Sequence, residues 1–252
     1  GMDVTLSVTA PQVRYNKQTI NNAVIAAALK NGQAGGSLKA ASLPGGGSVN
    51  MKADLKAESM SRNGANGSVI FANPVLSLDG QFALQSLKTV AVDWLQLVEA
   101  KTFENPQMPQ SASGQIQGRI QGARASLSSP ELSVGQYDMS GLNLAYTNAA
   151  EPTIDLSVGN FEGAAIKASG KLDQSQGVKV SVSHPNAAKF IQIFKPDFES
   201  TPNLQQSFSF NGTILKNGDT INVSGMNAKI GDIDATGNLA INTSGNPSSA
   251  DR

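Results

Sequence analysis

The sequence has no cysteine, a single histidine and few aromatic residues, and each shortage removes a class of function. Without cysteine there are no disulfide bonds, thiolate nucleophiles or cysteine-ligated metals, although the redox compartment stays open. Aromatic residues make up 5% of the chain, too few for a stacking platform for bases or sugars. A serine nucleophile needs a base beside it, and the one histidine, His184, precedes Pro185 at an expected helix start. We therefore expect no enzymatic activity and no bound cofactor.

Charge is sparse and balanced, because charged residues are 15% of the chain and 19 basic side chains cancel 19 acidic ones. Such a chain has no field to attract nucleic acid or an anionic membrane surface, so we expect no nucleic-acid partner. The longest apolar run, Ala23 to Leu29, is far shorter than the roughly 18 to 20 residues of a membrane span. Asp232 and Asp234 are the nearest candidates for metal ligands, but they alternate along one expected strand, so we expect no metal site.

Apolar and polar residues alternate in short runs throughout the chain, which is typical of strands with one face in water. Turn signals separate the runs, and Asn217-Gly218 predicts a type I′ hairpin. The alanine-rich stretch Asn22 to Leu29 fits a helix or a strand, and we favour a strand because Asn31-Gly32 follows it as a hairpin turn. The clearest alternating runs are Val4 to Val8, Val49 to Leu55, Ile154 to Val158, Val178 to Val182, and Ile221 to Val223.

One stretch of the chain is nearly repeated. The segment Gly135 to Gly141 returns as Gly231 to Gly237, 96 residues later, and Gly122 falls on Gly218 with the same offset. A gapless match predicts a repeated structural unit. We interpret residues 1–252 as a single elongated region with an internal repeat, about 75–146 and 165–242, followed by a polar tail at 243–252.

A second pattern places a glycine after two alternating apolar residues and a polar one. It occurs four times, ending at Gly80, Gly141, Gly170 and Gly237. Glycine inside a strand is typical of a bulge or bend, so the pattern predicts a sheet that curls the same way each time.

Two segments have helical rather than strand periodicity. Each lies roughly the same distance before the matching glycines of one copy, so we expect the repeat unit to include a helix. The first runs from Val90 to Lys101, and the second follows His184, with Pro185 at the first helical position and Lys195 in the last turn. The apolar faces are Val90, Trp94, Leu97 and Val98 in the first helix, and Ala187, Phe190, Ile191 and Phe194 in the second.

The fold class predicted from these patterns is mainly β. We expect an elongated, curled antiparallel sheet, either a trough or a half-open barrel, built from repeated β-meanders with two short amphipathic helices.

The stretch Phe208 to Leu239, which reads FSFNGTILKNGDTINVSGMNAKIGDIDATGNL, resembles the AsmA-like family of bacterial envelope proteins. So does Ala10 to Asn16, together with the Asn31-Gly32 turn and the Gly35-Gly36-Ser37 that follow it. The resemblance is one of pattern and order over most of the chain. It implies a periplasmic β-rich region with an apolar concave face, in proteins linked to phospholipid movement and outer-membrane assembly.

The same resemblance implies an inner-membrane helix before this region, and that helix is missing here. Gly1 before Met2 is typical of a residue left by tag removal, so we expect that an anchor precedes this segment in the natural protein. The predicted localisation is periplasmic, with phospholipid or another acyl-chain ligand and envelope proteins as partners.

A trough would place apolar strand residues against an acyl chain, which gains about 0.8 kcal/mol for each buried CH₂ group. The other reading closes the same residues into a dry core. In either case the two helices would cap the ends, through Trp94 and Leu97 in one and Phe190 and Phe194 in the other. The candidates for the groove are Val178, Val180, Val182, Ile221 and Val223.

The composition also leaves an alternative function open. An extracellular adhesin or glycan-binding β-domain would be equally rich in glycine, serine and asparagine, but it would expose clustered aromatic side chains. The chain has one tryptophan and three tyrosines for that purpose.

Overall fold

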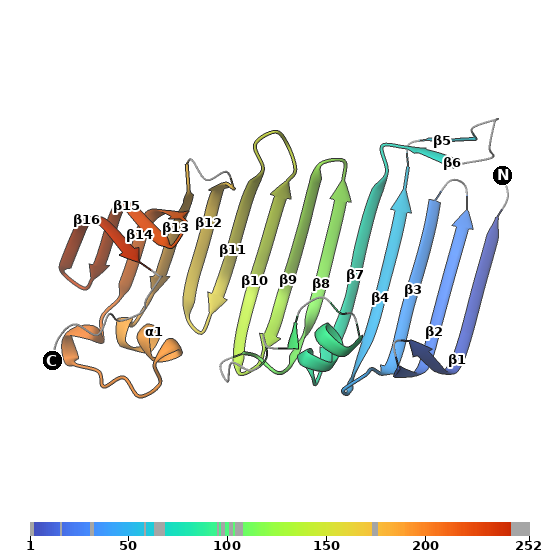
Figure 1. Cartoon of the computed structure of the whole chain (residues 1–252), viewed down its shortest axis with the longest axis horizontal. Coiled ribbons are helices and arrows are strands. Elements are labelled where there is room, and N and C mark those ends of the chain that lie inside the picture. Colours follow the sequence, from blue (N-terminus) through green and yellow to red (C-terminus); the bar gives the residue numbers. More distant parts are fainter. Residues whose placement is uncertain are drawn as a thin grey trace. The chain divides into compact units, whose positions relative to one another are not determined.

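The computed structural model describes residues 3–15, 17–30, 33–57, 59–62, 69–94, 96, 99–100, 103, 108–172 and 176–242. In this part of the chain, fourteen strands follow one another in a single antiparallel sheet, which begins at β1, ends at β16 and is not closed into a barrel (Figure 1). The predicted fold class, a mainly β chain with an open antiparallel sheet and short helices, is confirmed. The chain divides into two compact units, Gly1–Leu142 and Asn143–Arg252, which we call unit 1 and unit 2.

Unit 1 has a small hydrophobic cluster at one end of its strands. Ile20, Ala23, Ala40 and Leu43 form a small cluster, against which Val13, Val49 and Leu84 pack. The alanine-rich stretch lies in β2, so the preference for a strand there is confirmed. The elements are β1 (Val4–Tyr15), β2 (Gln18–Lys30), β3 (Gln33–Ser42), β4 (Gly47–Lys56), β5 (Ser59–Arg62), β6 (Val69–Ala72), β7 (Val75–Leu84), the π-helix η1 (Thr89–Trp94), β8 (Ala112–Gln121), β9 (Arg124–Val134) and β10 (Tyr137–Thr147), which crosses the unit boundary.

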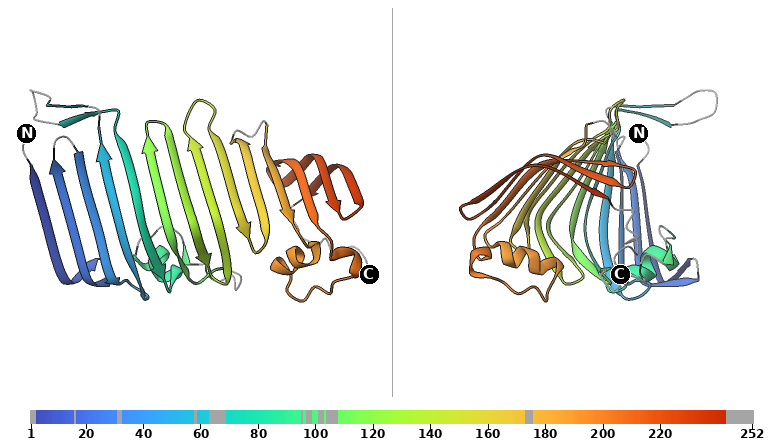
Figure 2. Two further views of the ribbon diagram at one scale, coloured as in Figure 1. Left: turned by 180° about the vertical axis from the view of Figure 1, so that it is seen from behind. Right: turned by 60° about the vertical axis from the view of Figure 1, so that its left-hand side comes forward.

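Unit 2 is a meander with one α-helix and a short 3₁₀-helix inserted between its third and fourth complete strands. The strands bend toward the side on which that helix, α1, lies (Figure 2). The elements are β11 (Thr153–Phe161), β12 (Ala164–Lys171), β13 (Val178–His184), α1 (Ala187–Phe194), the 3₁₀-helix η3 (Pro202–Leu204), β14 (Phe208–Asn217), β15 (Thr220–Ile230) and β16 (Ile233–Asn242).

The parts of the two copies that match at an offset of 96 residues form equivalent strands. The bounds of β14 and β15 are those of β8 and β9 displaced by 96 residues, and β16 begins 96 residues after β10. Equivalent backbone hydrogen bonds also recur. The amide of Leu87 donates to the carbonyl of Gln110 at 2.7 Å, and the amide of Ala187 donates to that of Gln206 at 2.7 Å. The same sequence pattern therefore builds the same helix-to-strand junction in each unit.

The helix starts share a cap. The side chain of Ser86 accepts a hydrogen bond from the amide of Thr89 at 3.2 Å, and the side chain of Asn186 accepts one from Lys189 at 2.9 Å. Such caps satisfy amides that the first helical turn leaves unpaired. Pro185 therefore stands before the cap and not at the first helical position, because the amide side chain of Asn186 takes that end.

The first helix ends earlier than its periodicity predicted. It stops at Trp94, and Gln96 has a φ of 53°, a left-handed conformation that α-helices do not continue through. The predicted helix from Val90 to Lys101 is therefore wrong beyond Trp94 for the described residues, and Leu97 and Val98 lie outside them.

The hairpin near Asn217 is tight, as predicted, but its turn type differs. Asn217 pairs with Thr220, so the two turn residues are Gly218 and Asp219. Gly218 has a φ of 56°, and Asp219 is not among the residues with positive φ. Glycine with positive φ at the first turn position is the pattern of a type II′ turn, whereas type I′ requires positive φ at both.

The strand glycines Gly80 and Gly170 do not mark bulges. Both lie in uninterrupted register with the strands on either side. A Cβ at Gly170 would lie 2.7 Å from the carbonyl oxygen of Gly177, so the neighbouring backbone approaches too closely for a side chain. The register shifts lie elsewhere, in β9, in β15 and near the end of β11.

Candidate functional site

The five groove candidates of unit 2 lie on one face of its sheet. Val178, Val180 and Val182 alternate along β13, so they point to the same side. Val178 is directly opposite Ile214 in β14, which is directly opposite Val223 in β15. Residues directly opposite each other in an antiparallel pair share a face, and Ile221, two residues before Val223, joins them. We call this side the apolar face of unit 2.

The apolar face runs across all the strands of unit 2. One row of directly paired residues crosses it without a polar side chain, and neighbouring rows add further apolar residues. The opposite face carries mostly serine, threonine, asparagine and charged residues. The row is Ile154, Gly170, Val178, Ile214, Val223 and Leu239.

Most of this face is not sealed. Val223 is 7% exposed, but the other four candidates are half-buried, and toward the edge strand Leu239 is 46% and Ile233 64% exposed. Within the described residues of unit 2 there is one sheet, with no second sheet over the apolar side. One candidate is therefore buried and four are half-buried, a burial between that of an open trough and that of a closed, dry core.

Helix α1 covers one end of the apolar face. The ring of Phe190 stacks on that of Phe208 with a centroid distance of 5.2 Å, and lies 5.9 Å from the imidazole of His184. Phe194 meets Phe190 edge to face at 5.5 Å, yet it is 65% exposed. Of the two phenylalanines predicted to cap the groove, Phe190 therefore packs on the sheet, whereas Phe194 faces outward.

His184 links this end of the sheet to the helix. It is 4% exposed, and its Nδ1 accepts a hydrogen bond from the amide of Asn186 at 2.9 Å. Its Nε2 lies 3.0 Å from the carbonyl oxygen of Glu162, which can only accept, so Nε2 carries the proton. Both ring nitrogens are thus occupied in holding the turn after β11 and the start of α1, which agrees with a structural role.

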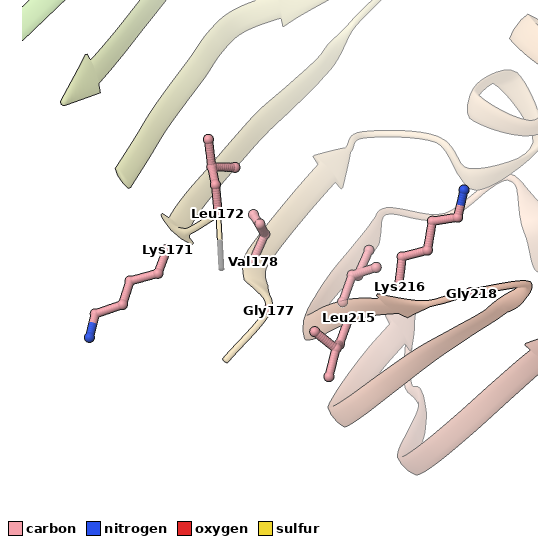
Figure 3. Close-up of a pocket in the computed structure, with 8 residues that line it drawn as sticks. Lys171, Leu172, Gly177, Val178, Leu215, Lys216 and Gly218 are labelled. Carbon is pink, nitrogen blue, oxygen red and sulfur yellow. The ribbon is translucent and has the colours of Figure 1, made fainter. Parts of the chain in front are cut away.

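The other end of the apolar face carries an open depression of about 400 Å³. Its lining includes the aliphatic side chains of Leu172, Val178, Ile214 and Leu215. Two lysines, Lys171 and Lys216, also line it (Figure 3). Leu172, Val178 and Lys216 project to one side of the strands, whereas Lys171 extends to the other, where it pairs with Glu151 at 2.6 Å. The end opposite α1 thus combines aliphatic side chains with two lysines, of which the strand register places only Lys216 on the apolar face.

Unit 1 has an apolar face of the same kind. A row of directly paired residues crosses it from β1 to β9, and several of its members are exposed, with Leu76 at 40% and Ile120 at 50%. Trp94 lies at the last position of η1 in this unit, and Leu97 lies outside the described residues. The row is Val4, Leu29, Ala34, Leu55, Leu76, Ile120 and Ala125.

Lys216 is the residue of this region that the sequence-based prediction missed. The signal was present in the repeat, because the offset of 96 residues aligns Lys216 with Ile120. A lysine where the other copy has isoleucine breaks the apolar pattern at one place.

Possible metal ligands do not gather in the part of the chain that the structure describes. No three His, Asp or Glu side chains come together there as a metal site. None of the helices in the described ranges has the length and apolar character needed to cross a membrane. Comparisons with protein-family models, with curated proteins and with solved structures gave no match.

Proposed function

We propose that the apolar face of unit 2 binds acyl chains, and that the protein is a non-enzymatic, periplasmic part of an AsmA-like envelope protein that acts in phospholipid transport or outer-membrane assembly. The observation that carries the proposal is the uninterrupted apolar row from Ile154 to Leu239, on a sheet with no second sheet over it in the described residues. All its members except Val223 are half-buried or exposed. Contiguous exposed apolar surfaces of this kind mark binding sites for apolar ligands or partners.

The binding energy that an open face offers to an acyl chain is modest but sufficient for weak, reversible binding. Full burial of a methylene contributes about 0.8 kcal/mol. An acyl chain lying on one sheet contacts protein on one side, so we expect about half of that value. A dozen methylenes would then contribute roughly 5 kcal/mol before the cost of ordering the chain is subtracted. Such weak, reversible binding suits a protein that passes lipid along and does not store it.

The stretch that resembles the AsmA-like family supports this assignment by its position. Phe208 to Leu239 forms β14, β15 and most of β16, and these strands supply Phe208, Ile214 and Val223 to the apolar face. The periplasmic location and the membrane anchor follow from the resemblance alone, and they are part of the proposal.

Two neighbouring residues of β13 provide a matched test. Val180 lies on the apolar face, and Ser181, the next residue, lies on the opposite face. We expect the wild-type protein to carry phospholipid or fatty acid in native mass spectrometry. Val180→Asp should lose that ligand, because a carboxylate on the apolar face is not solvated by an acyl chain. Ser181→Asp should keep it.

The controls separate binding from folding. Both variants should keep the far-ultraviolet circular dichroism of the wild type, since position 180 is half-buried and water can reach the new carboxylate. A folded Val180→Asp protein that binds as much lipid as the wild type would refute the proposal. So would a wild-type protein that binds no acyl ligand when incubated with phospholipid vesicles.

A further inference from the structure

Lys216 is exceptional among the strand residues of unit 2. It is directly opposite Ile221, two residues beyond Ile214, and it therefore lies on the apolar face. Within the described strands β11 to β16, every other Asp, Glu, Lys or Arg lies on the opposite face. Those residues are Asp155, Lys167, Lys171, Lys179, Lys229 and Asp234.

The repeat shows that the fold does not require a cation at this place. Ile120 occupies the equivalent position of β8, with Ala125 opposite it where unit 2 has Ile221 opposite Lys216. Ile120 is 50% exposed, so an apolar side chain is accommodated there without burial. The lysine is thus a difference in surface chemistry between two otherwise equivalent hairpins.

The surroundings of Lys216 leave its charge available. Its side chain is exposed, and it forms no ion pair with any residue in the described part of unit 2. The depression of about 400 Å³ beside it has Val178 and Ile214 in its lining. From Lys216, alternate residues of β14 lead through Ile214 and Phe210 to Phe208, where α1 covers the face. A cation therefore stands at the open end of an apolar track that spans roughly 27 Å at 3.4 Å per strand residue.

We infer that the preferred ligand of this face is an acyl chain with an anionic head, a carboxylate or a phosphate. The head would lie at Lys216 and the chain would run along β14 toward α1. This inference rests on the proposed acyl-binding function and adds to it the charge and the orientation of the ligand. The ammonium group of Lys216 attracts the anionic head. Because Lys216 is exposed, this attraction contributes little to the binding free energy and is sensitive to salt.

Amphiphiles that share one chain and differ in their heads test the inference. Dodecanoate, dodecyl phosphate and dodecan-1-ol would each displace the uncharged dye Nile red from the wild-type protein at pH 8 and low salt. We expect both anions to bind about three- to fivefold more tightly than the alcohol, which is the range of an exposed ion pair. The preference should shrink as salt is added.

Variants at two lysines test whether Lys216 causes the preference for anionic heads. Lys216→Ile installs the residue of the other copy, and we expect it to remove the preference while leaving the affinity for the alcohol unchanged. Lys216→Glu should reverse the preference. The control, Lys179→Ile, removes a lysine from the opposite face of the adjacent strand and should keep the preference of the wild type.

Each outcome decides a different point. Equal binding of anions and alcohol by the wild type overturns the inference and leaves the proposed function standing. A preference that survives in Lys216→Ile overturns the role of Lys216. Binding of none of the three amphiphiles overturns both proposals, and a wild-type dimer in light scattering that accompanies this result would show that a second copy covers the face. If dodecyl phosphate alone is preferred, phospholipid is the source of the head, and if dodecanoate alone is preferred, fatty acid is.

Discussion

Replacing Phe190 by alanine tests how α1 is held on the sheet. The ring is half-buried, stacked on Phe208 at 5.2 Å and close to His184. Truncating a fully buried phenylalanine costs about 3 to 5 kcal/mol. A half-buried ring should lose about half of that, and the aromatic pair with Phe208 is part of the same loss. We therefore expect the docking of α1 to weaken by about 2 kcal/mol.

Hydrogen exchange measured by mass spectrometry detects this weakening in the amides of α1. A weakening of about 2 kcal/mol raises the open population about 30-fold, so the amides of α1 should exchange about 30 times faster. Phe194→Ala is the matched control on the same helix. Its ring is 65% exposed, and we expect less than about 0.5 kcal/mol. Equal acceleration in the two variants would show that the stacking on Phe208 does not hold the helix.

Two further predictions concern the N-terminal caps of the helices and the glycines of two turns. Removing the cap in Asn186→Ala or Ser86→Ala should cost about 1 kcal/mol in its own unit, seen as faster exchange of the first helical turn with the other unit unchanged. Gly163→Ala should cost more, about 2 to 3 kcal/mol in urea denaturation, because φ is 94° there and the new Cβ would lie 2.7 Å from Nε2 of His184. Gly218→Ala, with positive φ but open space around it, should cost about 1 kcal/mol, and a loss equal to that of Gly163→Ala would contradict the steric argument.

The alternation of apolar and polar residues was sufficient to predict which residues share a face. Because side chains in a strand point alternately to the two sides, Val178, Val180 and Val182 had to lie together once the segment was a strand. The register with β14 and β15 then brings Ile221 and Val223 to the same side. Period-2 patterns carry this information directly, since a slip by one residue would expose every apolar side chain on the wrong face.

Local backbone geometry was less predictable. Glycine in a strand relieves either a bend or a close approach, and the pattern around Gly170 does not distinguish them. The helix η1 ends shortly before Gln96, which has a left-handed conformation, and no glycine or proline beside Gln96 predicts this end. How far each candidate is buried also could not be read from alternation, because the same pattern suits a covered sheet and an open one.

Unit 2 builds its apolar face as a single layer, so the width of that face follows from the number of its strands. Each added strand would widen the face by about 4.8 Å, while its depth stays set by the length of a strand. In β16 all ten residues are exposed, so a further hairpin could join this edge with no existing side chain having to be repacked. Duplication of hairpins would thus enlarge the apolar face in small, independent steps, a route that a closed barrel does not offer.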